Sequence, residues 1–306
     1  MTQYIARRLG YSLVSLFLLS LTIFLFVRLT GDPAVLFVEP GASQADLEAI
    51  REQFGLDQPI WVQYASFIAS LAHGDLGQSF YYRTPVFELY LTRLPNSLML
   101  AIAAMTFSLL IGIPSGILAA VRVNGFWDRA GKVFALLGLS VPSFWIGLVM
   151  ILFFSVYLEW LPSSGSGTPL HVLMPAFALG WYFAAAHMRL TRSSMLEVLG
   201  SEYIKLARLK GLPEALVIGK HAFKNALIPV LTLAGINLVI MINVAVVVET
   251  VFAWPGIGRL LYEGITFRDF PVVQGVVIMG GSMIVAVNLV IDILYAVIDP
   301  RIRLEA

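Results

Sequence analysis

Residues 225–248 read NALIPVLTLAGINLVIMINVAVVV and contain no charged side chain. A helix needs about 20 apolar residues to cross the roughly 30 Å hydrocarbon core of a bilayer. Five further stretches, residues 9–27, 97–121, 133–158, 172–188 and 270–298, are similarly apolar, and His187 and Asp292 are the only histidine or acidic residues within them. The sequence therefore predicts six transmembrane helices, at about residues 9–29, 97–121, 133–158, 171–189, 225–248 and 270–298.

Composition supports a polytopic all-α membrane protein. Of the 306 residues, 58% are hydrophobic and 13% are charged, against roughly 25% charged in a soluble domain. Within lipid, only helices and closed barrels satisfy the backbone, and these runs lack the alternating pattern of a barrel strand. The chain has no cysteine, and its 20 basic residues nearly balance its 19 acidic ones. These counts exclude disulfides and cysteine metal sites and do not suggest a nucleic-acid binder.

The first apolar run has an alternative interpretation as a signal peptide, because Arg7 and Arg8 precede it. It is longer than the usual apolar core of such a peptide. The RLTGDPA that follows it offers no clear small-residue cleavage site. We therefore expect a retained helix.

The distribution of charge sets the orientation. With the N-terminus inside, the inner segments hold 14 of the 20 basic residues, including all five lysines, and the outer segments hold 12 of the 19 acids. Basic residues accumulate on the cytoplasmic side, so both termini are expected in the cytoplasm. Residues 31–96 then form an outer, periplasmic segment. Within it, Ser43 and Asp46 have capping-box-like spacing, and WVQYASFIASLAHG predicts another helix.

The cytoplasmic loop 189–224 contains SEYIKLARLKG at residues 201–211. Ser194 and Glu197 have capping-box spacing, which predicts a helix start there. Gly211 and Pro213 end that helix, and a second helical stretch follows from about Glu214 to Asn225. The apolar stripe of the first helix comprises Met195, Val198, Leu199, Leu206 and Leu209, with Lys205, Arg208 and Lys210 mostly off it. Such an amphipathic helix could rest on anionic headgroups or dock into a groove of a cytoplasmic partner.

The stretch LARLKGLPEALVIGKHAFKNALIPVLT resembles the cytoplasmic loop of ABC-importer permeases, and most closely that of the dipeptide/oligopeptide (peptide/nickel/opine) family. The matching residues are Ala207, Arg208, Lys210, Gly211, His221, Ala222, Asn225, Ala226 and Pro229. The general loop motif E-A-A-x-x-x-G is only partly kept, since Lys205, Leu206 and Ala207 stand at its first three positions and Glu202 lies three positions early. Further blocks in the same order include GDPA, FGLDQPIWVQY, HGDLGQSF, MRLTRSSMLEVL, ETVFAWPGIGRLL and DPRIR.

The resemblance implies a single permease domain over residues 1–306 with a type I importer fold, in the bacterial inner membrane. It implies half of a pore for dipeptides or oligopeptides, formed with a second, homologous permease subunit. Two ATPase subunits and a periplasmic or lipid-anchored binding protein would complete the importer. The ATPase-coupling residues would be Glu202, Tyr203, Lys205, Leu206, Ala207, Arg208, Lys210 and Gly211.

The outer segment 249–269 has two interpretations. It could contact the binding protein through Trp254, Pro255, Gly256, Arg259 and Glu263, or it could be a re-entrant segment packed within this subunit. The Trp-Pro-Gly turn is too apolar for a free loop.

The chain itself is not expected to hydrolyse ATP. A Walker A loop needs G-x-x-x-x-G-K-[ST] so that backbone amides and the lysine cradle the phosphates. The closest approach is Gly125–Val133, which has one residue too many between its glycines and a valine in place of the hydroxyl. No cofactor and no metal site are expected in this chain, and ATP and Mg²⁺ would belong to the partner ATPases.

Polar residues within the predicted spans are candidates for the pore or for bonds between helices: Asn237, Asn243, Asn288 and Asp292. We favour interhelical roles for them and expect His187 to be a hydrogen-bonded interface residue. Gly112 and Gly116 form G-x-x-x-G, a weak sign of close helix contact. Alternative cargoes are nickel, glutathione, opines or oligosaccharides. A standalone channel or secondary carrier would normally show inverted repeats, and none is found.

Overall fold

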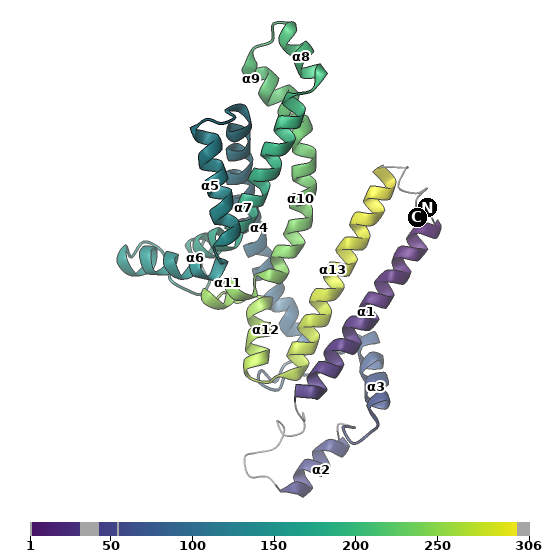
Figure 1. Ribbon diagram of the computed structural model, residues 1–306. Helices are drawn as coiled ribbons and strands as arrows, with labels where there is room; N and C mark the ends of the chain where they lie inside the picture. The colour runs from purple at the N-terminus through teal and green to yellow at the C-terminus, as the bar shows by residue number, and fades with distance from the viewer. Residues whose placement is uncertain (1, 31–42, 54, 299–306) are drawn as a thin grey trace. The chain divides into compact units, whose positions relative to one another are not determined.

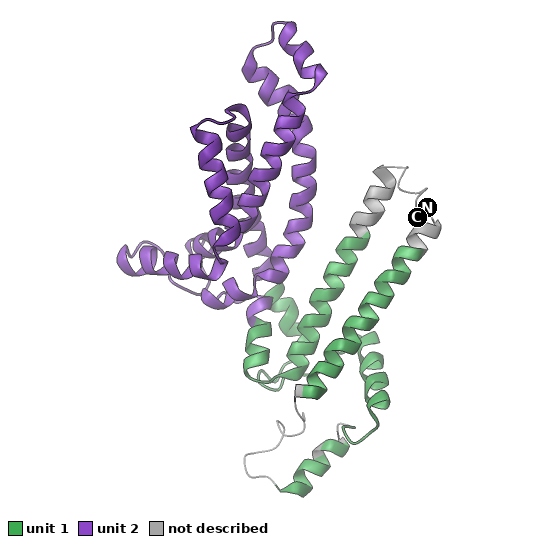
Figure 2. Cartoon of the chain, in the orientation of Figure 1, with its two compact units in different colours: residues 1–94, 260–306 green, residues 95–259 purple. Residues whose placement is uncertain are grey.

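The computed structural model describes residues 2–30, 43–53 and 55–298 (Figure 1). Over these ranges the regular structure is helical, apart from one isolated bridge between Gln78 and Pro85. The expected all-α class is confirmed. The chain divides into two compact units, residues 1–94 with 260–306 and residues 95–259 (Figure 2). The boundaries fall inside α4 (Val86–Val121) and α12 (Ile257–Thr266).

The first unit is built on α1 (Thr2–Thr30) and α13 (Phe270–Ile298), which pack against each other. Phe67 and Leu71 of α3 (Ile60–Ala72) pack against its buried residues Ile23, Val273 and Ile278. Tyr64 of α3 also donates or accepts a 2.9 Å hydrogen bond with Ser20. The short helix α2 (Gln44–Gln53) begins where expected, because Ser43 and Asp46 form the predicted reciprocal cap.

The loop before α4 is fastened to the segment between α12 and α13. The Asp269 carboxylate is buried and accepts hydrogen bonds from the Ser79 hydroxyl at 2.5 Å and the Tyr81 amide at 3.1 Å. The Tyr82 hydroxyl donates to Glu263 at 2.6 Å. Burial, together with this bond to Glu263, raises the pKa of Tyr82 to about 12.

The second unit surrounds α7 (Leu170–Leu199), which packs against α5 (Phe126–Ser140), α6 (Ser143–Met150) and α10 (Phe223–Val244). Helix α4 also approaches α7 closely. A Cβ on Gly112 would lie 2.8 Å from the Ala184 carbonyl oxygen, and one on Gly116 would lie 2.7 Å from that of Met188. The G-x-x-x-G prediction of close helix contact is therefore confirmed.

The helix predicted over residues 133–158 is broken into two parts in the structure. Helix α5 ends at Ser140, and α6 continues into the π-helical η2 (Ile151–Tyr157) after a 101° bend. Val141 is extended at the bend, and Pro142 precedes the first residue of α6. Proline disfavours helical backbone at the preceding residue and has no amide to continue the ladder.

Four helices of the described chain are long and apolar enough to cross a membrane, or five spans if the bent pair counts as one. The expected sixth, residues 171–189, is helical within α7 but is not among these candidates. This stretch is less apolar than the other spans because it contains His171, His187 and Arg189. About half of α7 is buried against protein, including Gly180 and His187. A helix enclosed by other helices does not need a uniformly lipophilic surface.

Two helix limits also differ from expectation. Ser194 and Glu197 lie inside α7 and start no helix, so the capping-box prediction there is wrong. After Gly200 the chain begins a new helix, α8 (Glu202–Leu209), with Ser201 at its N-cap position. The helix predicted over residues 225–248 also ends earlier than expected. In the structure α10 ends at Val244, and a separate helix, α11 (Val246–Val251), follows.

Candidate functional site

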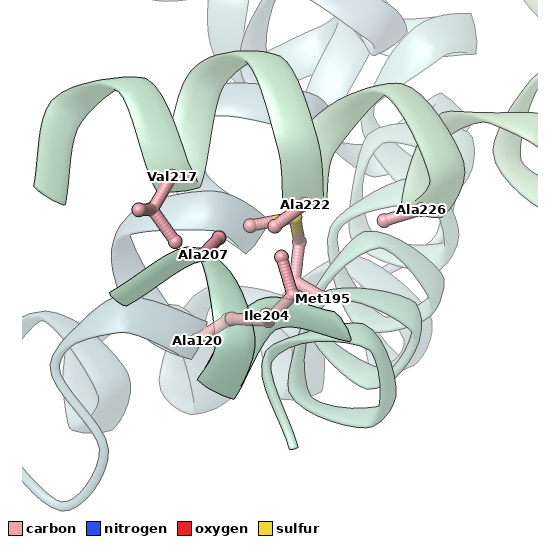
Figure 3. Packing of buried hydrophobic residues seen from close by; sticks show 7 residues of the cluster. All are labelled: Ala120, Met195, Ile204, Ala207, Val217, Ala222 and Ala226. Atoms are coloured by element: carbon pink, nitrogen blue, oxygen red, sulfur yellow. The ribbon is translucent and has the colours of Figure 1, made fainter. Parts of the chain in front are cut away.

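The loop between α7 and α10 folds around a small core of its own. Helix α8 is followed by α9 (Glu214–Leu216) and the π-helical η3 (Val217–Ala222), which leads directly into α10. Ile204 and Ala207 of α8 are buried against Val217 and Ala222 (Figure 3). The rest of the core is Ala120 of α4, Met195 of α7 and Ala226 of α10. Helix α8 is thus packed onto the ends of three long helices.

The turn after α8 has the hydrogen bonds of a Schellman motif. The Gly211 amide donates to Arg208 O at 2.9 Å, and the Leu212 amide donates to Ala207 O at 3.4 Å. Gly211 has φ = +78°, a left-handed conformation that favours glycine. Leu212 also packs against the loop core. The sequence prediction that Gly211 ends the helix is confirmed.

The outward face of α8 is apolar. Leu206 is 53% exposed and Leu209 85% exposed, with Tyr203 exposed one turn earlier. The predicted stripe is divided between two helices, because Met195, Val198 and Leu199 belong to α7 and only Leu206 and Leu209 lie on α8. The Tyr203 hydroxyl accepts a 2.8 Å hydrogen bond from Asn225 Nδ2 at the start of α10.

Charged residues flank this apolar face. Arg208 donates from Nη2 to Glu214 Oε1 at 2.6 Å and from Nε to Oε2 at 3.2 Å, so the pair is bidentate. Lys205 pairs with Glu202 at 2.8 Å. Both pairs are exposed, and exposed pairs contribute little to stability. The Arg208–Glu214 pair joins α8 to α9, and both pairs surround the apolar face with charge.

A second cluster lies at the turn between α11 and α12, and it centres on Glu249. This carboxylate is fully buried and accepts hydrogen bonds from the Ser97 hydroxyl at 2.6 Å and the Arg259 amide at 3.0 Å. A Cβ on Gly256 would lie 2.3 Å from the carboxylate, so no side chain fits there. The carboxylate caps the N-terminus of α12, where negative charge is favoured.

The Trp254–Pro255–Gly256 turn packs inside the second unit. Trp254 is buried, and its indole Nε1 donates to Asn96 O at 3.0 Å. The Asn96 amide donates in return to Pro255 O at 2.9 Å. Arg259 and Glu263, the other two candidates of this segment, are half-buried.

His187 is buried in a chain of polar side chains from three helices. Its Nδ1 lies 2.6 Å from Ser108 Oγ of α4, and its Nε2 lies 3.3 Å from Asn237 Nδ2 of α10. Both contacts are satisfied if His187 donates to Ser108 and accepts from Asn237. Asn243 instead donates to Val239 O within α10, and Asn288 is exposed. The side chain of Asp292 lies outside the described residues.

Sequence reasoning missed two buried acids, Asp128 and Glu249. Asp128 of α5 accepts hydrogen bonds from Arg192 of α7 at 2.7 Å and 3.2 Å and from Lys132 at 3.0 Å. Glu249 directly follows the apolar run 225–248, which was an available signal, whereas Asp128 lies within a charged segment and gave none. Over the described part of the chain, no three His, Asp or Glu side chains gather to form a metal site.

Comparison with known proteins agrees with this architecture. Residues 112–304 match the family of binding-protein-dependent transport system inner membrane components, and residues 1–101 match the N-terminal domain of such membrane components. The chain belongs to this family. The glutathione transport system permease protein GsiC of Escherichia coli strain K12 is 40% identical over 304 residues, covering 99% of both chains. GsiC of E. coli O6:H1 has the same identity and coverage.

Solved structures support the fold. The inward-facing MetNI methionine ABC transporter matches with a TM-score of 0.50 at 21% identity, covering 65% of this chain and 96% of that one. An amino acid ABC transporter crystallised with histidines matches with a TM-score of 0.52 at 14% identity, covering 70% and 94%. This family member is thus a permease of a peptide/nickel-type ABC importer in the bacterial inner membrane. It is not itself an enzyme, since ATP hydrolysis in this family lies in separate subunits.

Proposed function

We propose that α8 is the helix through which an ATPase subunit moves this permease. The observation that carries the proposal is the two-sided character of α8. Ile204 and Ala207 fix one face to the loop core, while Leu206 and Leu209 of the other face are exposed. Short amphipathic helices that show apolar side chains at such spacing bind into grooves of partner proteins. Exposed apolar surface of this kind marks an interaction site.

The core beneath α8 connects this helix to two helices that are candidates to span the membrane. Ala120 and Ala226 are in the same buried cluster as Ile204 and belong to α4 and α10, both long enough to span a bilayer. A displacement of α8 would therefore shift the ends of two candidate spans. Movement of an ATPase pair could in this way alternate the opening of the pore.

The test compares serine substitutions on and off the outward face. Leu209→Ser should reduce substrate-stimulated ATP hydrolysis and uptake about tenfold or more, because burying a leucine contributes roughly 1.5–3 kcal/mol. Leu216→Ser, which alters an exposed leucine of α9, is the matched control and should leave both nearly unchanged. Equal activity of the two variants would contradict the proposal.

A second variant separates docking from the alternative, in which α8 rests on lipid headgroups. Tryptophan favours the membrane interface, so Leu209→Trp would be tolerated or beneficial on a lipid surface. In a protein groove shaped for leucine, the larger ring would clash, and we expect coupling to fall. Normal transport by Leu209→Trp would favour the headgroup interpretation.

We further propose that the cargo is a short peptide and that the importer pairs this chain with a second, related permease, two ATPase subunits and a binding protein. The similarity to a glutathione permease over 99% of the chain supports this cargo class, since glutathione is itself a small peptide. Competition uptake assays with dipeptides, a longer oligopeptide, glutathione and nickel would test it. Inhibition by nickel alone would contradict a peptide cargo.

We propose that the Trp254–Pro255–Gly256 turn packs within this subunit and does not contact the binding protein. Trp254 and Pro255 bond to Asn96 within the same unit, so they are not available to a binding protein in this conformation. Crosslinkers at Arg259 or Glu263 should fail to capture the binding protein during turnover. Reproducible capture would instead assign this segment to the docking surface.

A further inference from the structure

A cavity of about 420 Å³ lies between α5 and α7 in the second unit. Three basic side chains line it: Lys132 of α5, and Arg189 and Arg192 of α7. Leu136 and Leu139, farther along α5, form its apolar wall, and the Ser193 hydroxyl contributes a further polar group. The cavity is therefore cationic at one end and aliphatic at the other.

The cationic end has excess positive charge. The buried Asp128 carboxylate lies against it and accepts from both Arg192 and Lys132. One carboxylate facing three cations leaves a net charge of +2. Arg189 is exposed, and among the described residues its guanidinium has no ion pair or hydrogen bond to protein. Arg192 and Lys132 are thus held in place by Asp128, and Arg189 is left to meet an anion.

Aromatic residues indicate the depth of this end in the membrane. Phe126 and Trp127 begin α5 and are 76% and 45% exposed. Exposed aromatic rings of this kind concentrate at the membrane–water boundary. Lys132 follows Trp127 by five residues, a rise of about 8 Å along the helix. Its long side chain can reach back to the boundary, while Leu136 and Leu139 lie deeper.

We propose that this cavity binds the phosphate group of an anionic phospholipid, with an acyl chain along Leu136 and Leu139. Guanidinium groups match phosphate oxygens with paired N–H donors, and basic pockets between membrane helices suit lipid headgroups. The aliphatic wall distinguishes a lipid from free phosphate, which would leave it uncovered. The lipid would join the ends of α5 and α7 next to the coupling loop.

The test uses the assembled importer in nanodiscs that contain phosphatidylglycerol with a photoactivatable acyl chain. After illumination, peptides from α5 and α7 should carry the label. Arg189→Gln should lower the labelling of these peptides about fivefold, which corresponds to the roughly 1 kcal/mol of one basic residue at an anionic surface. Arg129→Gln is the matched control, because Arg129 is an exposed residue of α5 that does not line the cavity.

Four outcomes would overturn the proposal. The first is equal labelling in the two variants when both keep the wild-type unfolding temperature. The second is equal labelling by a phosphatidylcholine probe with the same acyl chain, which would show that the cavity does not discriminate lipids by headgroup charge. The third is full displacement of the lipid by millimolar glycerol 3-phosphate, which would assign the site to a soluble phosphate compound. Absence of label from α5 and α7 in the assembled complex would also refute it, since a partner subunit would then cover the cavity.

Discussion

The Glu249 carboxylate accepts a 2.6 Å hydrogen bond from the Ser97 hydroxyl, and both groups are fully buried. The two residues are 152 positions apart in the chain. The same hydroxyl accepts a 2.8 Å hydrogen bond from the Ile257 backbone amide. One serine and one carboxylate thus join α4 to both helices of the outer turn.

Glu249→Gln should destabilise the permease. Each carboxylate oxygen accepts from a different donor, and the amide nitrogen that replaces one oxygen cannot accept a hydrogen bond. Leaving a buried donor unsatisfied costs about 1–3 kcal/mol, and a loss of about 2 kcal/mol lowers the unfolding temperature of a chain of 306 residues by roughly 3 °C. Thermal unfolding in detergent measures this. Glu197→Gln, at an exposed site on α7, should shift the midpoint by less than about 1 °C; a comparable shift in both variants would show that Glu249 has no special role.

Ala207→Trp should disrupt the loop rather than block an external contact. Ala207 is 8% exposed and packs against Val217 and Ala222, so its small size suits the loop core rather than a contact with a partner. Overpacking costs about 1–3 kcal/mol. Limited proteolysis should cut residues 200–222 faster in this variant, with membrane insertion unchanged. Unchanged proteolysis with lost coupling would favour the external role.

Gly211→Val should weaken the cap of α8 by about 1–2 kcal/mol, because φ = +78° is unfavourable for residues with a branched Cβ. A new Cβ would meet nothing within 4 Å, so backbone strain is the whole effect. Gly211→Asn is the control, since asparagine tolerates the left-handed region. Substrate-stimulated ATPase activity should fall clearly in the valine variant and only slightly in the asparagine variant; equal loss in both would point to a steric contact with the partner.

All five lysines should be unreachable from outside the cell. Each is exposed on the chain, so burial within the permease would not explain a lack of labelling. A membrane-impermeant amine reagent should leave Lys205 and Lys220 unmodified in intact cells and modify them after permeabilisation. Labelling of either residue from outside would overturn the predicted orientation.

Sequence reasoning succeeded where the cause of a structure is local. The length of residues 270–298 and the left-handed turn at Gly211 follow from nearby residues, and both agree with the structure. It failed where tertiary contacts decide. Ser194 and Glu197 have the spacing of a helix start, but burial of Ser194 and Met195 within α7 carries the helix past them.

The same limit applies to the candidate sites. Amphipathic spacing predicted a helix that includes α8, but Ile204 was overlooked, because its burial depends on packing against α4, α7 and α10. The partners of Glu249 and Asp128 come from distant helices, and one sequence contains no signal that pairs them. A bend at Pro142 follows from proline chemistry alone, but its angle of 101° does not.

The cap that ends α8 has a counterpart at the end of α11, where Ala253 takes the position that Gly211 has after α8. There the Ala253 amide donates to Thr250 O and the Trp254 amide to Glu249 O, the same pair of bonds as around Gly211. Ala253 takes φ = +48°, which costs an alanine roughly 1–2 kcal/mol. Trp254 and Glu249 hold it there, so strain is stored at this turn and is released if the tryptophan leaves its site. The glycine cap stores none. The cap of the cytoplasmic loop therefore has no strain to release, while the outer turn has an energetic reason to change conformation once its anchor is lost.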